Sequence, residues 1–164
     1  MMKFATERLS ACMPAAAELH EAHWAETEGY REQDGFCPDY EQFYQLERNQ
    51  QFVYFTVRDE EQRLVGHLGF VIHKSRHTSQ IEAVEDFFYL KPEARKGMTA
   101  SGLLRAAVAW LRECGIKNIG MSSKLGHEID PLLRRAGFVK VAYLYTLEKS
   151  HVLQQPVASA SASS

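Results

Sequence analysis

The sequence lacks the features that mark membrane, secreted and metal-binding proteins. No apolar run approaches the roughly 20 residues that cross a bilayer. The first residues, MMKFATERLSACM, carry charges where a signal peptide needs an apolar core. Three cysteines, Cys12, Cys37 and Cys114, are an odd number without the spacing of metal ligands. These absences predict a protein of a reducing cytoplasm that has no membrane partner.

The chain also lacks an excess of either charge. The Lys and Arg residues number 19 and the Asp and Glu residues 21, for a formal net charge of −2. We therefore expect no nucleic-acid partner, and any anion site must be local. The length of 164 residues suits one domain, which we place at residues 1–149. Residues 150–164 are rich in Ser and Ala and predict a disordered tail.

Hydrophobic spacing and turn residues predict a mixed chain of strands and helices. We expect strands at residues 3–9, 52–57, 64–72, 84–90, 116–121 and 138–147. We expect helices at residues 14–28, 39–51, 103–114 and 128–136, with Asp39 as an N-cap. Gly66 and Gly69 interrupt one strand and indicate a bulge or the close approach of another group.

The most informative stretch is residues 84–105, VEDFFYLKPEARKGMTASGLLR. An apolar strand ends at Pro92, a short loop of small and basic residues follows, and a helical pattern comes next. Free backbone N–H groups and the helix dipole attract anions at such a helix start, and Arg95 and Lys96 add positive charge. The stretch predicts a phosphate site, although an ordinary strand–helix connection has the same pattern.

The sequence from Pro92 to Leu104 resembles the signature P-x-x-R-G-x-G-x-G-x-x-L-L of the GNAT superfamily of acyl-CoA-dependent N-acyltransferases. It aligns without a gap, with Arg95 in the leading position and Met98 where the family normally has a glycine. The order of the elements and the later pair Gly137-Phe138 agree with this resemblance.

Other short matches extend the resemblance to most of residues 15–148. They are similar to GNAT proteins of tailed bacteriophages and prophages, and include His23-Trp24, Glu85-Asp86, Met121-x-x-Lys124 and His127 before Pro131-Leu132-Leu133.

The resemblance implies the GNAT fold, a mixed α/β (α+β) architecture with a central sheet of about six or seven strands and about four flanking helices. It implies acetyl-CoA as co-substrate, bound in a cleft between the fourth and fifth strands, and no metal. The implied contacts are Phe88, Tyr89, Leu90, Arg95, Lys96, Gly97, Met98, Thr99, Ala100 and Ser101. A metal at the pair His20 and His23 lacks a third ligand nearby in the sequence.

Acetylation of an amine needs a group that removes a proton from the ammonium. We assign this role to Glu85, directly or through water, whereas alternation along the strand sends Asp86 to the other face. Both acids also fit solvated positions at a strand end. The tyrosine that many family members use as general acid is replaced here by Leu133.

Three alternatives remain for the general acid. His127 is one, Tyr143 or Tyr145 on the last strand is another, and a thiolate that leaves without a dedicated acid is the third. We assign catalysis to Glu85, His127 and Tyr145.

Acidic and aromatic residues of the first two helices and their surroundings predict a pocket for a cationic amine, either a small molecule or a protein lysine. The candidates are His23, Trp24, Glu28, Tyr30, His77 and Asp86.

The sequence therefore predicts a cytoplasmic N-acetyltransferase of a bacterium or an infected host cell. Two alternatives are a GNAT-fold transferase that modifies a DNA base and a non-catalytic module that binds acyl-CoA or a partner. A homodimer through the last strands is a further option.

Overall fold

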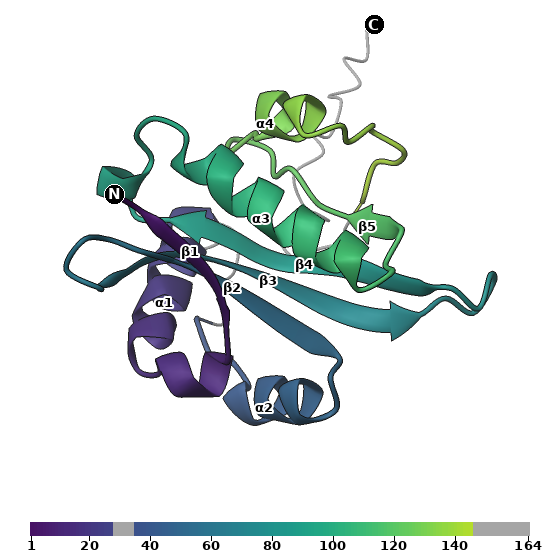
Figure 1. Ribbon diagram of the computed structural model, residues 1–164, viewed down its shortest axis with the longest axis horizontal. Coiled ribbons are helices and arrows are strands. Elements are labelled where there is room, and N and C mark those ends of the chain that lie inside the picture. The colour runs from purple at the N-terminus through teal and green to yellow at the C-terminus, as the bar shows by residue number, and fades with distance from the viewer. Residues whose placement is uncertain (28–34, 146–164) are drawn as a thin grey trace, which may run out of the picture.

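The structure is a computed structural model that describes residues 1–27 and 35–145 (Figure 1). Within these residues one sheet has the strand order β1-β2-β3-β4-β5. The first four strands are antiparallel neighbours, and β5 runs parallel to β4. The bounds are β1 (Lys3–Glu7), β2 (Phe52–Arg58), β3 (Leu64–Lys74), β4 (Ile81–Leu90) and β5 (Asn118–Gly120). The predicted mixed α+β class is confirmed.

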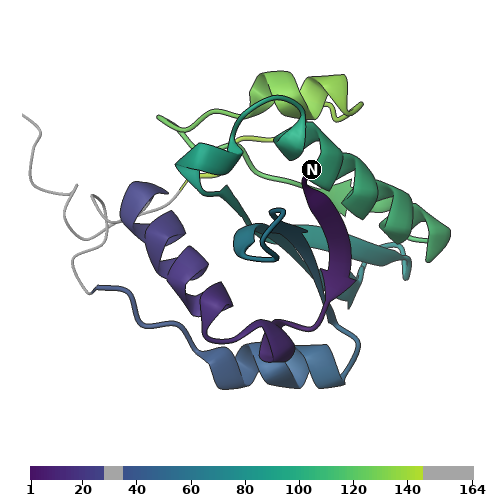
Figure 2. The same ribbon diagram turned by 60° about the vertical axis from the view of Figure 1, so that its left-hand side comes forward.

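Helices cover both faces of the sheet (Figures 1 and 2). One face carries η1 (Leu9–Cys12), α1 (Ala15–Thr27) and α2 (Tyr40–Arg48). The other carries η2 (Pro92–Ala94), α3 (Thr99–Glu113) and α4 (Asp130–Arg135). Among the described residues no helix combines the length and the apolar character needed to span a bilayer.

Strand β2 shows how the sequence builds two cores. Val53, Phe55 and Val57 belong to the apolar cluster beneath α3, whereas Phe52 and Tyr54 belong to the cluster beneath α1 and α2. Because both faces of the sheet are covered, the strand reads as a continuous run of apolar residues instead of an alternating one.

A β-bulge interrupts the pairing of β3 with β4. Gly69 faces Phe87 while Phe70 faces Glu85, so Asp86 is the extra residue on β4. The bulge inverts the alternation of side chains along β4. Ala83, before it, packs in the α3 core, but Phe87, after it, packs beneath α1. The bulge predicted near Gly69 is therefore present, with its extra residue on the partner strand.

Gly69 lies where no side chain fits. A Cβ atom there would stand 2.5 Å from the ring of Phe87 and 2.8 Å from that of Phe52. We expect Gly69→Ala to lower the free energy of unfolding by about 1–3 kcal/mol, because both buried rings must shift. Gly120→Ala is the matched control in a strand, since its nearest neighbours are 3.8 Å away. Equal midpoints in urea for the two variants would contradict this explanation.

The predicted last strand at residues 138–147 is wrong for its described part. Residues 138–145 have no strand structure, and residues 146 and 147 lie outside the described residues. Val141, Leu144 and Tyr145 are 88–94% exposed. A β-prone sequence becomes a strand only when it pairs with the edge of a sheet, and residues 138–145 pair with none of the described strands. The described sheet accordingly has five strands instead of six or seven, with the four α-helices that were predicted.

Candidate functional site

The site lies where β4 and β5 diverge. The two strands pair only from Glu82 to Val84 on β4 and from Asn118 to Gly120 on β5. Beyond this point a cavity of about 350 Å³ opens between β4, α1, the start of α3 and the segment that follows β5. This volume falls in the range of small-molecule sites.

Glu85 stands at the point of divergence. Its carboxylate accepts hydrogen bonds from the Ser122 hydroxyl at 2.8 Å and from the Ser122 backbone N–H at 3.1 Å. Burial raises the pKa of Glu85, and the two bonds from Ser122 partly offset this rise. Glu85 is thus a fixed carboxylate in the cavity with an enhanced affinity for protons.

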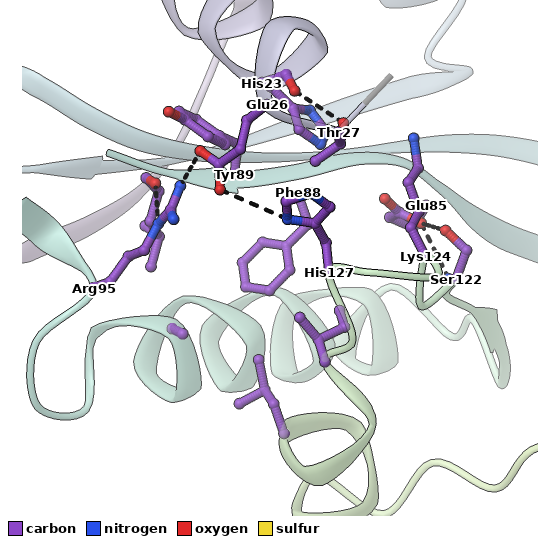
Figure 3. Close-up of a pocket in the computed structure, with 14 residues that line it drawn as sticks. His23, Glu26, Thr27, Glu85, Phe88, Tyr89, Arg95, Ser122, Lys124 and His127 are labelled. Carbon is purple, nitrogen blue, oxygen red and sulfur yellow. Dashed lines mark hydrogen bonds and ion pairs between the residues drawn. The ribbon is translucent and has the colours of Figure 1, made fainter. Parts of the chain in front are cut away.

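Glu26 of α1 lies between Arg95 and His127 across the cavity (Figure 3). Arg95 donates from Nη2 to Glu26 at 2.6 Å and from Nε to the Leu90 carbonyl at 2.8 Å. The Arg95 guanidinium holds the pKa of Glu26 below its usual range. His127 Nδ1 lies 3.9 Å from the other oxygen of Glu26. These contacts connect α1, the end of β4 and the segment after β5 along one side of the main cavity.

The start of α3 supplies a helix N-terminus at the cavity, where Ala100 lines the wall. The preceding turn places Gly97 at φ +61°, a conformation that favours glycine, whereas Met98 has φ −101°. Met98 therefore fits its position without backbone strain, although it stands in place of a family glycine. The Thr99 hydroxyl donates to the Lys96 carbonyl and closes the turn.

Three histidines line or adjoin the α1 side of β4. His20 Nδ1 is 3.2 Å from the Tyr40 hydroxyl, and His67 Nδ1 is 3.1 Å from the Tyr54 hydroxyl. Among the described residues neither Nε2 atom has a hydrogen-bond partner. Burial lowers the pKa of His20 to about 4 and holds that of His67 well below its usual value. Burial, with a contribution from the charge of Lys124, also lowers the pKa of His23 to about 4.

These histidines make stability depend on pH in a defined direction. An unfolded histidine binds its proton near pH 6.5, whereas folded His20 does so near pH 4. Its contribution to stability is therefore present above pH 6.5 and is lost as the pH falls toward 4. As the pH falls from 7 to 5, we expect the free energy of unfolding of His20→Phe to rise by about 2 kcal/mol relative to that of the parent.

Urea unfolding at several pH values measures this difference. The comparison between variants matters because Glu85 and Asp86, whose pKa values burial raises, take up protons in the folded state and oppose the histidines. His77→Gln, in the exposed hairpin loop, is the control and should follow the parent at every pH. A pH-independent gain for His20→Phe would refute the assignment.

Comparison with known proteins identifies the family. Residues 16–138 match the acetyltransferase (GNAT) family. The chain belongs to this family. A search of curated proteins gives no match.

Solved structures share the GNAT fold with this chain at low sequence identity. A predicted acetyltransferase with acetyl-CoA from Clostridium acetobutylicum is 14% identical, with a TM-score of 0.67 over 90% of this chain and 96% of that one. A ribosomal-protein-alanine N-acetyltransferase from Brucella melitensis is 16% identical, with a TM-score of 0.68 over 90% and 98%.

An aminoglycoside acetyltransferase from an uncultured soil metagenomic sample, in complex with trehalose, is 16% identical. Its TM-score is 0.65 over 90% of this chain and 97% of that one. At these identities the similarity shows the fold alone.

The structure brings several of the predicted residues of this GNAT chain together in the main cavity. These are Glu85, His127, His23, Phe88, Tyr89, Leu90, Arg95 and Ala100. Lys96, Gly97, Met98, Thr99 and Ser101 form the adjoining turn and helix start without lining the cavity. Trp24 and Asp86 line a second cavity, which His23 shares.

The remaining predicted residues do not meet at the site. Tyr145 is 88% exposed and lines neither cavity. His77 lies in the loop of the β3–β4 hairpin, which projects away from α1 at the right of Figure 1. Glu28 and Tyr30 lie outside the described residues.

Sequence reasoning missed Glu26, Thr27 and Ser122, which line the main cavity. The signal for Glu26 was its spacing of three residues from His23, which places both side chains on one helix face. No local pattern marks Ser122, because its role depends on the divergence of β4 and β5.

Proposed function

We propose that this GNAT protein transfers the acetyl group of acetyl-CoA to a primary amine by direct attack in a ternary complex. The observation that carries the proposal is the placement of Glu85. Its carboxylate stands where β4 and β5 diverge, in the same cavity as the N-terminus of α3.

The residues present fit acetyl-CoA. The N-terminus of the 15-residue helix α3 directs backbone N–H groups toward an anion, as a pyrophosphate requires. Lys96 in the preceding turn adds positive charge. Among the described strands, β5 pairs only with the start of β4. From Phe88 to Leu90 the edge of β4 that faces away from β3 is therefore unpaired, and it offers backbone groups to the pantetheine amides. Acetyl-CoA supplies the activated acetyl thioester.

Glu85 takes up a proton from the acceptor ammonium, directly or through one water, and its raised affinity for protons favours this step. The amine nitrogen then bonds to the acetyl carbon while the carbon–sulfur bond breaks and the sulfur keeps the electron pair. The nitrogen releases its second proton to water, which leaves the neutral amide. His127, in the same cavity, donates a proton to this sulfur, a role suited to imidazole.

The proposal includes the cellular compartment in which the protein acts. The similarity to GNAT proteins of tailed bacteriophages and prophages supports a role in the cytoplasm of a bacterium or an infected host cell.

The exposed apolar side chains of residues 139–145 favour a homodimer. Sedimentation at several protein concentrations tests this expectation.

The experiment that tests the function combines binding with turnover. We expect acetyl-CoA to raise the melting temperature of the protein. We also expect release of free CoA thiol when a panel of primary amines is added. Acetyl-CoA binding without release from any amine would favour the non-catalytic module. Release of CoA thiol with a nucleoside that bears a modified base, but with none of the simple amines, would favour base modification.

A further inference from the structure

A second cavity of about 180 Å³ adjoins the main one. Ring-bearing residues of α1, of the segment before α2 and of β4 surround it. His23, Thr27 and Lys124 line both cavities, so a molecule in the second cavity adjoins the cavity that Glu85 lines.

The walls of this second cavity are largely aromatic and packed against one another. Ring centroids lie 4.3 Å apart for His20 and Phe87, 6.2 Å for Phe43 and Phe87, and 5.8 Å for Trp24 and Phe36. Such packing holds the rings in place before any ligand enters. The cavity is therefore a preformed apolar site.

The size of this cavity limits what it can hold. An apolar cavity of about 150 Å³ in another protein takes up benzene. A cavity of about 180 Å³ thus accommodates one six-membered ring or one branched aliphatic side chain. A molecule of several linked sugar rings would extend beyond this space, into the main cavity or into solvent.

The charged residues of the lining further restrict the chemical class of the ligand. Asp86 is the one carboxylate among the described lining residues, and Lys124 is the one lysine or arginine. His20 and His23 add no positive charge at neutral pH, because burial keeps both imidazoles neutral. A polyamine would bring several cations to a site with one carboxylate and one cation, whereas a molecule with one ammonium and one carboxylate matches both.

We propose that the second cavity binds a free α-amino acid with an aromatic or large aliphatic side chain, as the acceptor of the acetyl group. The side chain occupies the ring-lined space, the ammonium lies toward Asp86 and the carboxylate toward Lys124. This inference rests on the proposed function, and it narrows the acceptor class.

The position of Asp86 suits the transfer. Asp86 is the bulged residue next to Glu85, and the two consecutive acids line different cavities. An ammonium held near Asp86 is therefore close to the carboxylate that removes its proton. The nitrogen loses that proton to Glu85 and bonds to the acetyl carbon as the carbon–sulfur bond breaks. The sulfur keeps the electron pair and takes up a proton, and the nitrogen releases its second proton to water as the amide forms. The products are an N-acetylamino acid and CoA.

The first experiment measures binding to the protein without acetyl-CoA by calorimetry. We expect L-phenylalanine to bind at least about tenfold tighter than phenethylamine, which lacks the carboxylate, and than 3-phenylpropionate, which lacks the ammonium. Spermidine and a lysine-containing peptide should bind more weakly still. Equal or tighter binding of phenethylamine, spermidine or the peptide would overturn the inference.

Two substitutions locate the binding. Lys124→Met should remove the preference for L-phenylalanine over phenethylamine, and Asp86→Asn should remove the preference over 3-phenylpropionate. Lys117→Met, an exposed position before β5 that lines neither cavity, is the control and should keep both preferences. Unchanged preferences in the first two variants would place the amino acid elsewhere.

The outcomes separate this inference from the function on which it rests. If acetyl-CoA binds and simple amines are acetylated while L-phenylalanine does not bind, the inference fails and the function stands. If L-phenylalanine binds with the expected preferences but acetyl-CoA neither binds nor reacts, the amino-acid site stands and the acetyl transfer fails.

Discussion

Glu85→Gln is expected to lower kcat for amine acetylation by about 10²–10⁴-fold, the usual contribution of a positioned general base. The substitution keeps the size of the side chain and leaves an oxygen that can accept the two bonds from Ser122. It removes only the capacity to take up a proton. The melting temperature should therefore remain close to that of the parent while turnover is lost.

The pH profile of the activity distinguishes loss of the general base from distortion of the site. Glu85 acts only when deprotonated, and burial raises its pKa. The activity of the parent should therefore fall on acidification at a higher pH than an exposed glutamate would give. This acidic limb should be absent from the residual activity of Glu85→Gln.

Glu82→Gln provides the matched control for this assay. Glu82 lies on the same strand, hydrogen bonds Asn118 and does not line the cavity. Its variant should retain both kcat and the acidic limb. A Glu85→Gln enzyme whose pH profile matches the parent would show that another group removes the proton.

The sequence predicted most of the elements because their signals are local. Asp39 caps α2 through the Gln42 N–H at 3.0 Å, as its residue type and position indicate. The hairpin of β2 and β3 follows from two apolar runs separated by a polar turn. Pairing with a neighbour lengthens a strand beyond its apolar run, so β4 begins at Ile81 instead of residue 84.

The site was harder to predict because it depends on tertiary pairing. The separation of Glu85 and Asp86 into two cavities depends on a bulge whose exact position no local pattern fixes. Arg95 was expected beside a phosphate, yet it pairs with Glu26, a partner 69 residues away in the sequence. Such a contact follows only from the packing of α1 against the sheet.

Two further differences have physical explanations. Met98 replaces a family glycine, but the turn needs its positive φ at Gly97, which the chain retains. The stretch at residues 138–145 has the composition of a strand, but composition does not specify which edge receives it. Both cases show that a residue type predicts a conformation only where the backbone or a neighbour demands it.

Ala100→Glu is expected to weaken the binding of acetyl-CoA by at least about 100-fold. Ala100 is the second residue of α3 and lines the main cavity. A carboxylate there would meet the pyrophosphate at close range, and two unit charges about 4 Å apart repel by about 4 kcal/mol near a protein surface. Ala100 also packs against the core beneath α3, so both a glutamate and a glutamine there cost some stability, and the helix dipole offsets part of this cost for the glutamate.

Ala100→Gln separates charge from bulk in this experiment. Glutamine has nearly the same size as glutamate, so any steric obstruction is equal in the two variants, and only the glutamate repels an anion. Calorimetry should therefore show a much smaller loss of affinity for Ala100→Gln. The difference between the variants should shrink as salt is added, since screening weakens the repulsion. Equal losses of affinity at low salt would mean that no anion lies at this end of α3, and that acetyl-CoA reaches Glu85 by another path.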